Sequence, residues 1–220
     1  MKNYISEFLG TFALIFCGTG AMVINEVTGG AVSHVGIAIT WGFIVIAMIY
    51  AYGDISGAHF NPAVSIAFAV AKKFSWKEVP KYILAQTLGA LLASITLKFL
   101  FPESEILGAT IPTIEPLRAF VLEIILTFIL MLTIINVSTG SKEVGIVAGI
   151  AIGGVVLLEA MFAGPVTNAS MNPVRSLAPA LVSGKLEHLW LYLTAPIIGA
   201  ILAIFSCKLV KDDDCCTEGC

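Results

Sequence analysis

The 220-residue sequence is too apolar for a soluble domain, since 58% of its residues are hydrophobic, only 12% are charged and its mean hydropathy is +0.95. Its net charge of −3 offers no basic surface of the kind that binds nucleic acid, so we expect no nucleic-acid partner. The first apolar run contains Glu7 and lacks a small-residue cleavage site. It therefore predicts a retained membrane span rather than a secretory signal.

Six apolar runs are long enough to cross a bilayer as helices, which takes about 20 residues each. In chain order they cover residues 5–24, 35–53, 79–101, 118–137, 144–163 and 189–209. Two further runs, 62–71 and 173–182, reach only half of that length, or roughly 15 Å as helix. We therefore expect an all-α membrane protein with six transmembrane helices and two half-helices that enter the membrane without crossing it.

The two halves of the chain repeat each other. SGAHFNPAVSIA (56–67) matches TNASMNPVRSLA (167–178), and Glu7 of EFLGTF corresponds to Glu123 of EIILTF. Each half holds three spans, an odd number, so the second copy must lie upside down in the membrane relative to the first. The pattern predicts an inverted three-plus-three repeat.

One domain is therefore expected over residues 1–210. It comprises repeat 1 at about 4–101, a connector rich in prolines and acids at 102–117, and repeat 2 at about 118–210. The tail at 211–220, KDDDCCTEGC, follows this domain.

Basic residues indicate the orientation, because they are enriched in cytoplasmic loops. A cytoplasmic N-terminus places eight of them inside, namely Lys2, Lys72, Lys73, Lys77, Lys81, Lys142, Lys208 and Lys211. Only Lys98, Arg118 and Lys185 then fall outside. We expect a multi-pass protein of the cell membrane with both termini in the cytoplasm.

An Asn–Pro pair precedes each half-helix, at Asn61–Pro62 and Asn172–Pro173. Asn is a favoured N-cap, and Pro at the first helical position loses no hydrogen bond, so each pair begins a helix. The non-helical backbone before each pair must be buried in protein or line a water-filled cavity. Two half-helices together span one bilayer, so the two Asn residues are expected to meet near its midplane.

These doubled motifs, the inverted repeat and Arg175, three residues after the second Asn, resemble the aquaporin family over about residues 4–210. In AGPVTNASMNPVRSLAP and its Val174 the chain is similar to nodulin-26-like channels. The resemblance implies a passive channel for water and small uncharged solutes, such as glycerol-like polyols and boric or arsenous acid. It also implies exclusion of ions and protons, and a homotetramer in the lipid bilayer.

The motif residues are expected to form the pore midplane, which consists of Asn61, Pro62, Ala63, Asn172, Pro173 and Val174. The Asn amides would donate hydrogen bonds to passing solutes, and the positive ends of the half-helices would repel cations. Backbone carbonyls without helical partners are expected to line the pore at Gly57, Ala58, His59, Asn168, Ala169 and Ser170.

The resemblance also implies an outer constriction, or selectivity filter, formed by Trp41, Ala160, Ala169 and Arg175. Water-selective relatives carry bulkier side chains there, so Ala160 predicts a wider and more apolar opening. Typical glycerol facilitators have Asp after the Arg, whereas this chain has Ser176.

Three acids and the tail complete the candidate residues, and two of these acids, Glu7 and Glu123, are expected to be buried. Glu7 and Glu123 are expected to accept hydrogen bonds from the re-entrant backbone. For Glu159 two roles stay open, lining the pore mouth or capping a neighbouring backbone group. The tail is interpreted as a solvated end, with the alternative that its thiols bind a thiophilic metal or trivalent arsenic through Cys215, Cys216 and Cys220.

Three alternatives compete with a polyol-permeable channel. A strictly water-selective channel would share the motifs, and a secondary transporter also uses inverted repeats and broken helices. A structural junction protein would have a closed pore. The spans hold no nucleophile–base set or metal cluster, so we expect neither an enzyme nor a cofactor.

Overall fold

The computed structural model describes residues 1–138 and 146–210. Six of the helices in this part are long and apolar enough to cross a membrane, as the sequence predicted. They are α1 (Lys2–Val27), α2 (Ser33–Ser56), α4 (Val79–Leu100), α5 (Pro116–Ser138), α7 (Ala148–Thr167) and α9 (Leu189–Val210). Two short helices, α3 (Pro62–Val70) and α8 (Pro173–Ser183), complete the described elements and confirm the all-α class with two half-helices.

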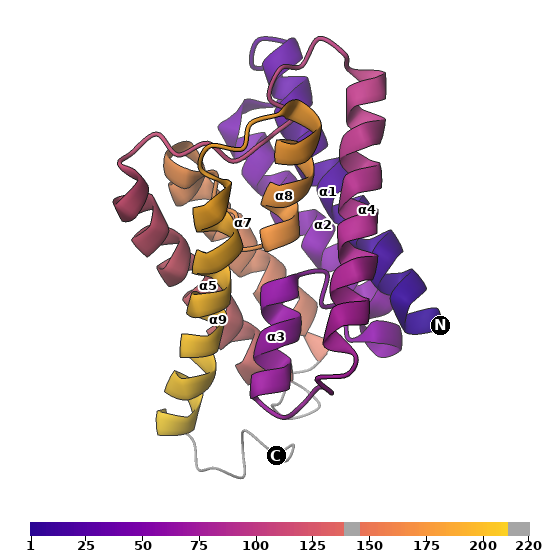
Figure 1. The fold of residues 1–220 in the computed structure, drawn as a ribbon, viewed down its shortest axis with the longest axis vertical. Coiled ribbons are helices and arrows are strands. Elements are labelled where there is room, and N and C mark those ends of the chain that lie inside the picture. Colours follow the sequence, from indigo (N-terminus) through magenta and orange to yellow (C-terminus); the bar gives the residue numbers. More distant parts are fainter. Residues whose placement is uncertain (139–145, 211–220) are drawn as a thin grey trace.

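The helices pack as two equivalent sets. In the first half α1 packs against α4, in the second half α5 packs against α9, and α2 and α7 join the halves. Both half-helices contact α4 and α9, and they also contact each other. Figure 1 shows α8 above α3, with the N-terminus and the C-terminal end of α9 in the lower half of the view.

Close helix pairs within each half depend on a glycine. A Cβ atom at Gly89 in α4 would lie 2.3 Å from the backbone oxygen of Phe8 in α1. At Gly199 in α9 it would lie 2.3 Å from the backbone oxygen of Ile124 in α5. Small residues let membrane helices approach backbone to backbone, and the two repeats use this device at corresponding positions.

The end predicted for the fifth span, residue 163, is wrong, because α7 continues through Pro165 to Thr167. Proline has no N–H, so the carbonyl of Met161 loses its helical donor. The ring Nε2 of His34 lies 2.6 Å from this oxygen and donates in its place. A contact from α2 therefore stabilises the part of α7 that continues beyond the predicted end at residue 163. The predicted start of this span, residue 144, lies outside the described residues.

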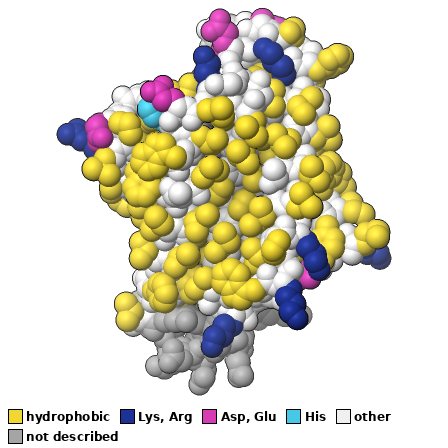
Figure 2. Space-filling model, in the orientation of Figure 1, with side chains coloured by type: hydrophobic (Ala, Val, Ile, Leu, Met, Phe, Trp, Pro, Cys, Tyr) yellow, Lys and Arg dark blue, Asp and Glu magenta, His cyan; other side chains and the backbone are white. Residues whose placement is uncertain are grey.

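The outer surface is that of a protein surrounded by lipid. Figure 2 shows hydrophobic side chains over the middle of the visible face, with charged side chains toward its two ends. Large apolar side chains such as Phe43, Leu158 and Phe162 are more than half exposed. Burying them in hydrocarbon removes that apolar area from water, so the chain is a multi-pass membrane protein.

Candidate functional site

The two Asn side chains cap the half-helices. Asn61 Oδ1 accepts a hydrogen bond of 2.9 Å from the Ala63 amide. Asn172 Oδ1 accepts bonds of 3.1 and 3.4 Å from the amides of Val174 and Arg175. Each Asn has extended backbone and is followed by Pro at the first helical position, so the local sequence alone begins both helices.

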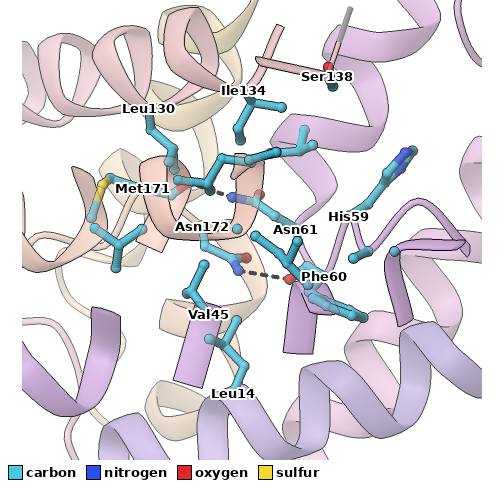
Figure 3. Close-up of a pocket in the computed structure, with 18 of the residues that line it drawn as sticks. Leu14, Val45, His59, Phe60, Asn61, Leu130, Ile134, Ser138, Met171 and Asn172 are labelled. Atoms are coloured by element: carbon cyan, nitrogen blue, oxygen red, sulfur yellow. Dashed lines mark hydrogen bonds between the residues drawn. The ribbon is translucent and has the colours of Figure 1, made fainter. Parts of the chain in front are cut away.

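The same side chains also tie the two re-entrant segments together. Asn61 Nδ2 donates to the carbonyl of Met171 at 2.8 Å, and Asn172 Nδ2 donates to the carbonyl of Phe60 at 2.9 Å (Figure 3). A side-chain amide has two N–H groups, so each Asn keeps one for a solute. The sequence predicted the donors but not this reciprocal pairing, which joins positions more than 100 residues apart.

Glu7 holds the first re-entrant segment from inside the bundle. Its fully buried carboxylate accepts hydrogen bonds from the backbone amides of His59 and Phe60 at 2.9 and 2.8 Å. It also accepts bonds from the Ser56 hydroxyl and the Gln86 amide, both at 2.8 Å. Four donors thus surround one carboxylate, which compensates for its removal from water.

Glu123 performs the same task in the second repeat. Its carboxylate accepts bonds from the amides of Ser170 and Met171 at 2.9 and 3.0 Å, and from the Thr167 hydroxyl at 2.7 Å. Glu123 is fully buried, like Glu7. Both acids therefore bind the amides of the two residues that precede the motif Asn.

This anchoring fixes a backbone shape that the sequence does not favour. Ala58 and Phe60 have φ of 50° and 47°, and the corresponding Ala169 and Met171 have 43° and 53°. Residues with a Cβ seldom adopt this left-handed region, at a cost of about 1–3 kcal/mol each. The bonds to the two acids offset that cost, and the segments stay non-helical inside the membrane.

A cavity of about 420 Å³ runs past both motifs. Both Asn side chains line it, and Figure 3 shows them among the apolar side chains of Leu14, Leu130 and Ile134. It extends to Ser138 at the end of α5 and to Arg175 in α8. Polar groups on one part of the wall and apolar groups on the rest suit small uncharged solutes that pass in a row.

Most of the expected carbonyl-bearing residues line this cavity, namely Gly57, Ala58, His59, Ala169 and Ser170. Within the described residues, none of their carbonyl oxygens accepts a hydrogen bond. Asn168 does not line the cavity; its Oδ1 accepts a bond of 2.9 Å from the Ile111 amide and so holds the connector.

The four residues expected in the filter, Trp41, Ala160, Ala169 and Arg175, all line the cavity. The guanidinium carbon of Arg175 lies 4.8 Å from the centre of the Trp41 ring. One guanidinium nitrogen donates to the Gly108 carbonyl at 2.8 Å, and the other donates to the Met22 sulfur at 3.1 Å. No carboxylate of the described residues forms an ion pair with Arg175.

Comparison with known proteins identifies the family. The model of the major intrinsic protein family matches residues 1–206. The chain belongs to this family. It is 46% identical to "Putative aquaporin NIP4-1" of Arabidopsis thaliana over 97% of the chain and 76% of that relative. It is also 46% identical to "Nodulin-26" of Glycine max over 97% of the chain and 79% of that relative.

A solved aquaglyceroporin from Plasmodium falciparum has the same fold, with a TM-score of 0.86 and 30% identity over 95% of this chain and 96% of that one. Major intrinsic proteins are passive channels and not enzymes. This major intrinsic protein is accordingly a channel for water and small neutral solutes.

Four other residues predicted at the midplane of this channel follow the two Asn residues in sequence but do not form the cavity wall. Pro62, Ala63, Pro173 and Val174 do not line the cavity. They form the first turns of the half-helices and are buried in the surrounding packing. Their side chains offer no hydrogen-bond donor, and the amides of Ala63 and Val174 donate to the capping Asn side chains, so their part is to begin the helices.

His59 lines the cavity and is also packed among aromatic rings. Its ring lies 4.9 Å from that of Phe68 and 4.8 Å from that of Phe74, and its Nδ1 lies 3.0 Å from the Ser65 hydroxyl.

Glu159 follows neither of its two expected roles. It is 3% exposed, it does not line the cavity, and both carboxyl oxygens lack a hydrogen-bond partner within the described residues. The predicted thiol site of the tail, at Cys215, Cys216 and Cys220, lies outside the described residues.

The sequence did not indicate Met22 or Gly108 as partners of Arg175. Both come from distant segments, α1 and the connector, and neither residue type signals such a contact.

Proposed function

We propose that this channel admits small polyols and uncharged metalloid acids as well as water, and that Trp41, Ala160, Ala169 and Arg175 form its selectivity filter. One observation supports this most directly: two of the four positions present only a methyl group to the cavity. An opening with two alanines leaves space for a solute larger than water. The name of the structural relative, an aquaglyceroporin, points to the same class of solute.

The permeant is proposed to be uncharged for two electrostatic reasons. Arg175 carries a full positive charge at the cavity, and the N-termini of α3 and α8 add about half a positive charge each. A cation therefore meets repulsion along the path. The apolar part of the wall offers no replacement for the hydration of an ion of either sign.

Replacing Ala160 by His tests the filter assignment. An imidazole fills the space of the methyl group, so glycerol permeability is expected to fall about tenfold or more relative to water permeability. Stopped-flow light scattering of proteoliposomes measures both rates. Phe162→His, which places the same ring on the exposed face of the same helix, is the matched control.

An unchanged ratio in Ala160→His would place the constriction elsewhere. If the unaltered protein conducts water but no glycerol, boric acid or arsenous acid, the channel is strictly water-selective. Saturable uptake that depends on an ion gradient would instead indicate a transporter.

Replacing Arg175 by Val tests the barrier to charge. The substitution removes the full charge at the cavity and leaves the two half-helix ends in place. Proton or cation permeability is expected to rise, which a pH-sensitive dye inside the vesicles detects. Proton leakage equal to that of the unaltered protein would show that the half-helix ends exclude protons without Arg175.

We also propose that both termini face the cytoplasm of a cell membrane and that four copies assemble, each with its own pore. The N-terminus and the C-terminal end of α9 lie in the same half of the bundle (Figure 1), which supports a common side. Two of the basic residues behind this orientation, Lys142 and Lys211, lie outside the described residues. Protease access to terminal tags in intact cells tests the orientation, and light scattering of the purified protein tests the tetramer.

A further inference from the structure

Arg175, the one charged member of the proposed filter, is held by contacts to uncharged groups. Its guanidinium donates to the carbonyl of Gly108 and to the sulfur of Met22, and it lies against the ring of Trp41. A thioether sulfur is among the weakest acceptors in proteins. Because no carboxylate fixes the group within the described residues, its position depends on what each neighbour presents.

We propose that Met22 is an oxidation site through which small hydroperoxides alter the filter. This inference depends on the proposed role of Arg175 as the filter's charged residue. In the reaction a sulfur lone pair attacks one peroxide oxygen and the O–O bond breaks. The sulfur is oxidised to a sulfoxide by two electrons, and the peroxide is reduced to water or to an alcohol. The product is polar and chiral, and methionine sulfoxide reductases reverse the change.

The geometry gives this oxidation a direct effect on Arg175. The sulfur and the guanidinium nitrogen are 3.1 Å apart, so no atom fits between them. A sulfoxide oxygen on that side must displace one of the two groups, and it is a far stronger acceptor than the thioether.

The cavity offers a direction for this displacement. Gly108 and Trp41 occupy two sides of the guanidinium, and Met22 itself occupies a third. Arg175 also lines the cavity, which is space that the guanidinium can enter. Oxidation is therefore expected to move the charged group toward the cavity and to narrow the filter, which affects glycerol more than water.

Met22 is distinct among the six methionines of the chain. Its sulfur is the one that bonds to Arg175 in the described residues, and its side chain is only partly buried. Met131 and Met171 are buried, with 0% and 3% exposure. Met48 in α2 forms no hydrogen bond to a filter residue within the described part of the chain, and it provides a control.

The test uses the purified full-length protein in proteoliposomes treated with hydrogen peroxide. Mass spectrometry is expected to find one added oxygen on Met22, and the ratio of glycerol to water permeability is expected to fall at least about twofold. Treatment with methionine sulfoxide reductase should restore the ratio. Met48→Leu should respond to peroxide like the unaltered protein.

Two variants at Met22 separate the effect from general damage. Met22→Leu keeps the volume without the sulfur, so its ratio should not respond to peroxide. Met22→Gln places an amide oxygen near Arg175, so its ratio should be low before any treatment. Three outcomes would each overturn the inference. Met22→Leu could respond to peroxide as strongly as the unaltered protein, or the ratio of glycerol to water permeability could stay unchanged although Met22 is oxidised. Met22 could also remain unoxidised under conditions that oxidise the exposed Met1.

Failure of the proposed function has a different signature. If the untreated protein passes no glycerol, the polyol proposal fails, and the effect of oxidation is then measured on water permeability. A fall in water permeability that Met22→Leu abolishes would still support the oxidation site, whereas no fall would overturn it.

Discussion

The bonds between Glu123 and the second re-entrant segment lead to a quantitative prediction for Glu123→Gln. The carboxylate accepts bonds from the Thr167 hydroxyl and from the amides of Ser170 and Met171. In its better orientation the Gln side chain keeps its oxygen toward Thr167 and Ser170 and turns its NH2 group toward the Met171 amide. Two donors then face each other, and one backbone N–H is left unpaired in a fully buried site.

The expected loss follows from these bonds. An unpaired buried N–H costs about 1–3 kcal/mol, and the change of two bonds from a charged to a neutral acceptor adds about 1 kcal/mol. The sum of about 2–4 kcal/mol corresponds to a fall of about 5–15 °C in melting temperature for a chain of this size. Because the loop shape depends on these bonds, water permeability per folded protein should also fall.

Glu159→Gln is the matched control, because Glu159 is nearly as buried but accepts no hydrogen bond within the described residues. Its melting temperature is expected to stay at or above that of the unaltered protein. Thermal unfolding in detergent, followed by tryptophan fluorescence, measures both variants, and stopped-flow scattering measures permeability. Equal losses in the two variants would refute the reasoning, since burial of an acid rather than its hydrogen bonds would then decide stability.

Two other substitutions test helix contacts. Gly89→Ala improves helix propensity by about 1 kcal/mol, but its methyl carbon would lie 2.3 Å from a backbone oxygen of α1. The yield of folded protein should therefore fall. Gly154→Ala is the control and should be harmless, because its methyl carbon would have no atom within 4 Å. His34→Ala removes the donor to the carbonyl of Met161 and should lower the melting temperature by about 2–8 °C, a loss of about 1–2 kcal/mol. His188→Ala, at a surface position, is its control, and an equal change in both would contradict the role given to His34.

The sequence by itself determined the class of structure and the centre of the site. Six apolar runs of bilayer length specify six spans, because backbone polar groups must be paired within each segment in lipid. The Asn–Pro pairs specify the starts of both half-helices, because capping involves only neighbours two or three residues away. Glu7 and Glu123 stand at matching positions of the two repeats, each in an apolar run. An acid there is costly unless its carboxylate is hydrogen-bonded, so the sequence also indicated two buried acids.

Tertiary structure decided the contacts that give these elements their chemistry. The partner of each Asn amide is a carbonyl more than 100 residues away, and Met22 lies 153 residues before Arg175. His34 bonds to the carbonyl of Met161, 127 residues away, and so supports α7 where Pro165 interrupts its hydrogen bonds. Local patterns report on neighbours within a turn or two of helix, whereas a thioether or a lone histidine becomes a partner only when the fold brings it to an unpaired group.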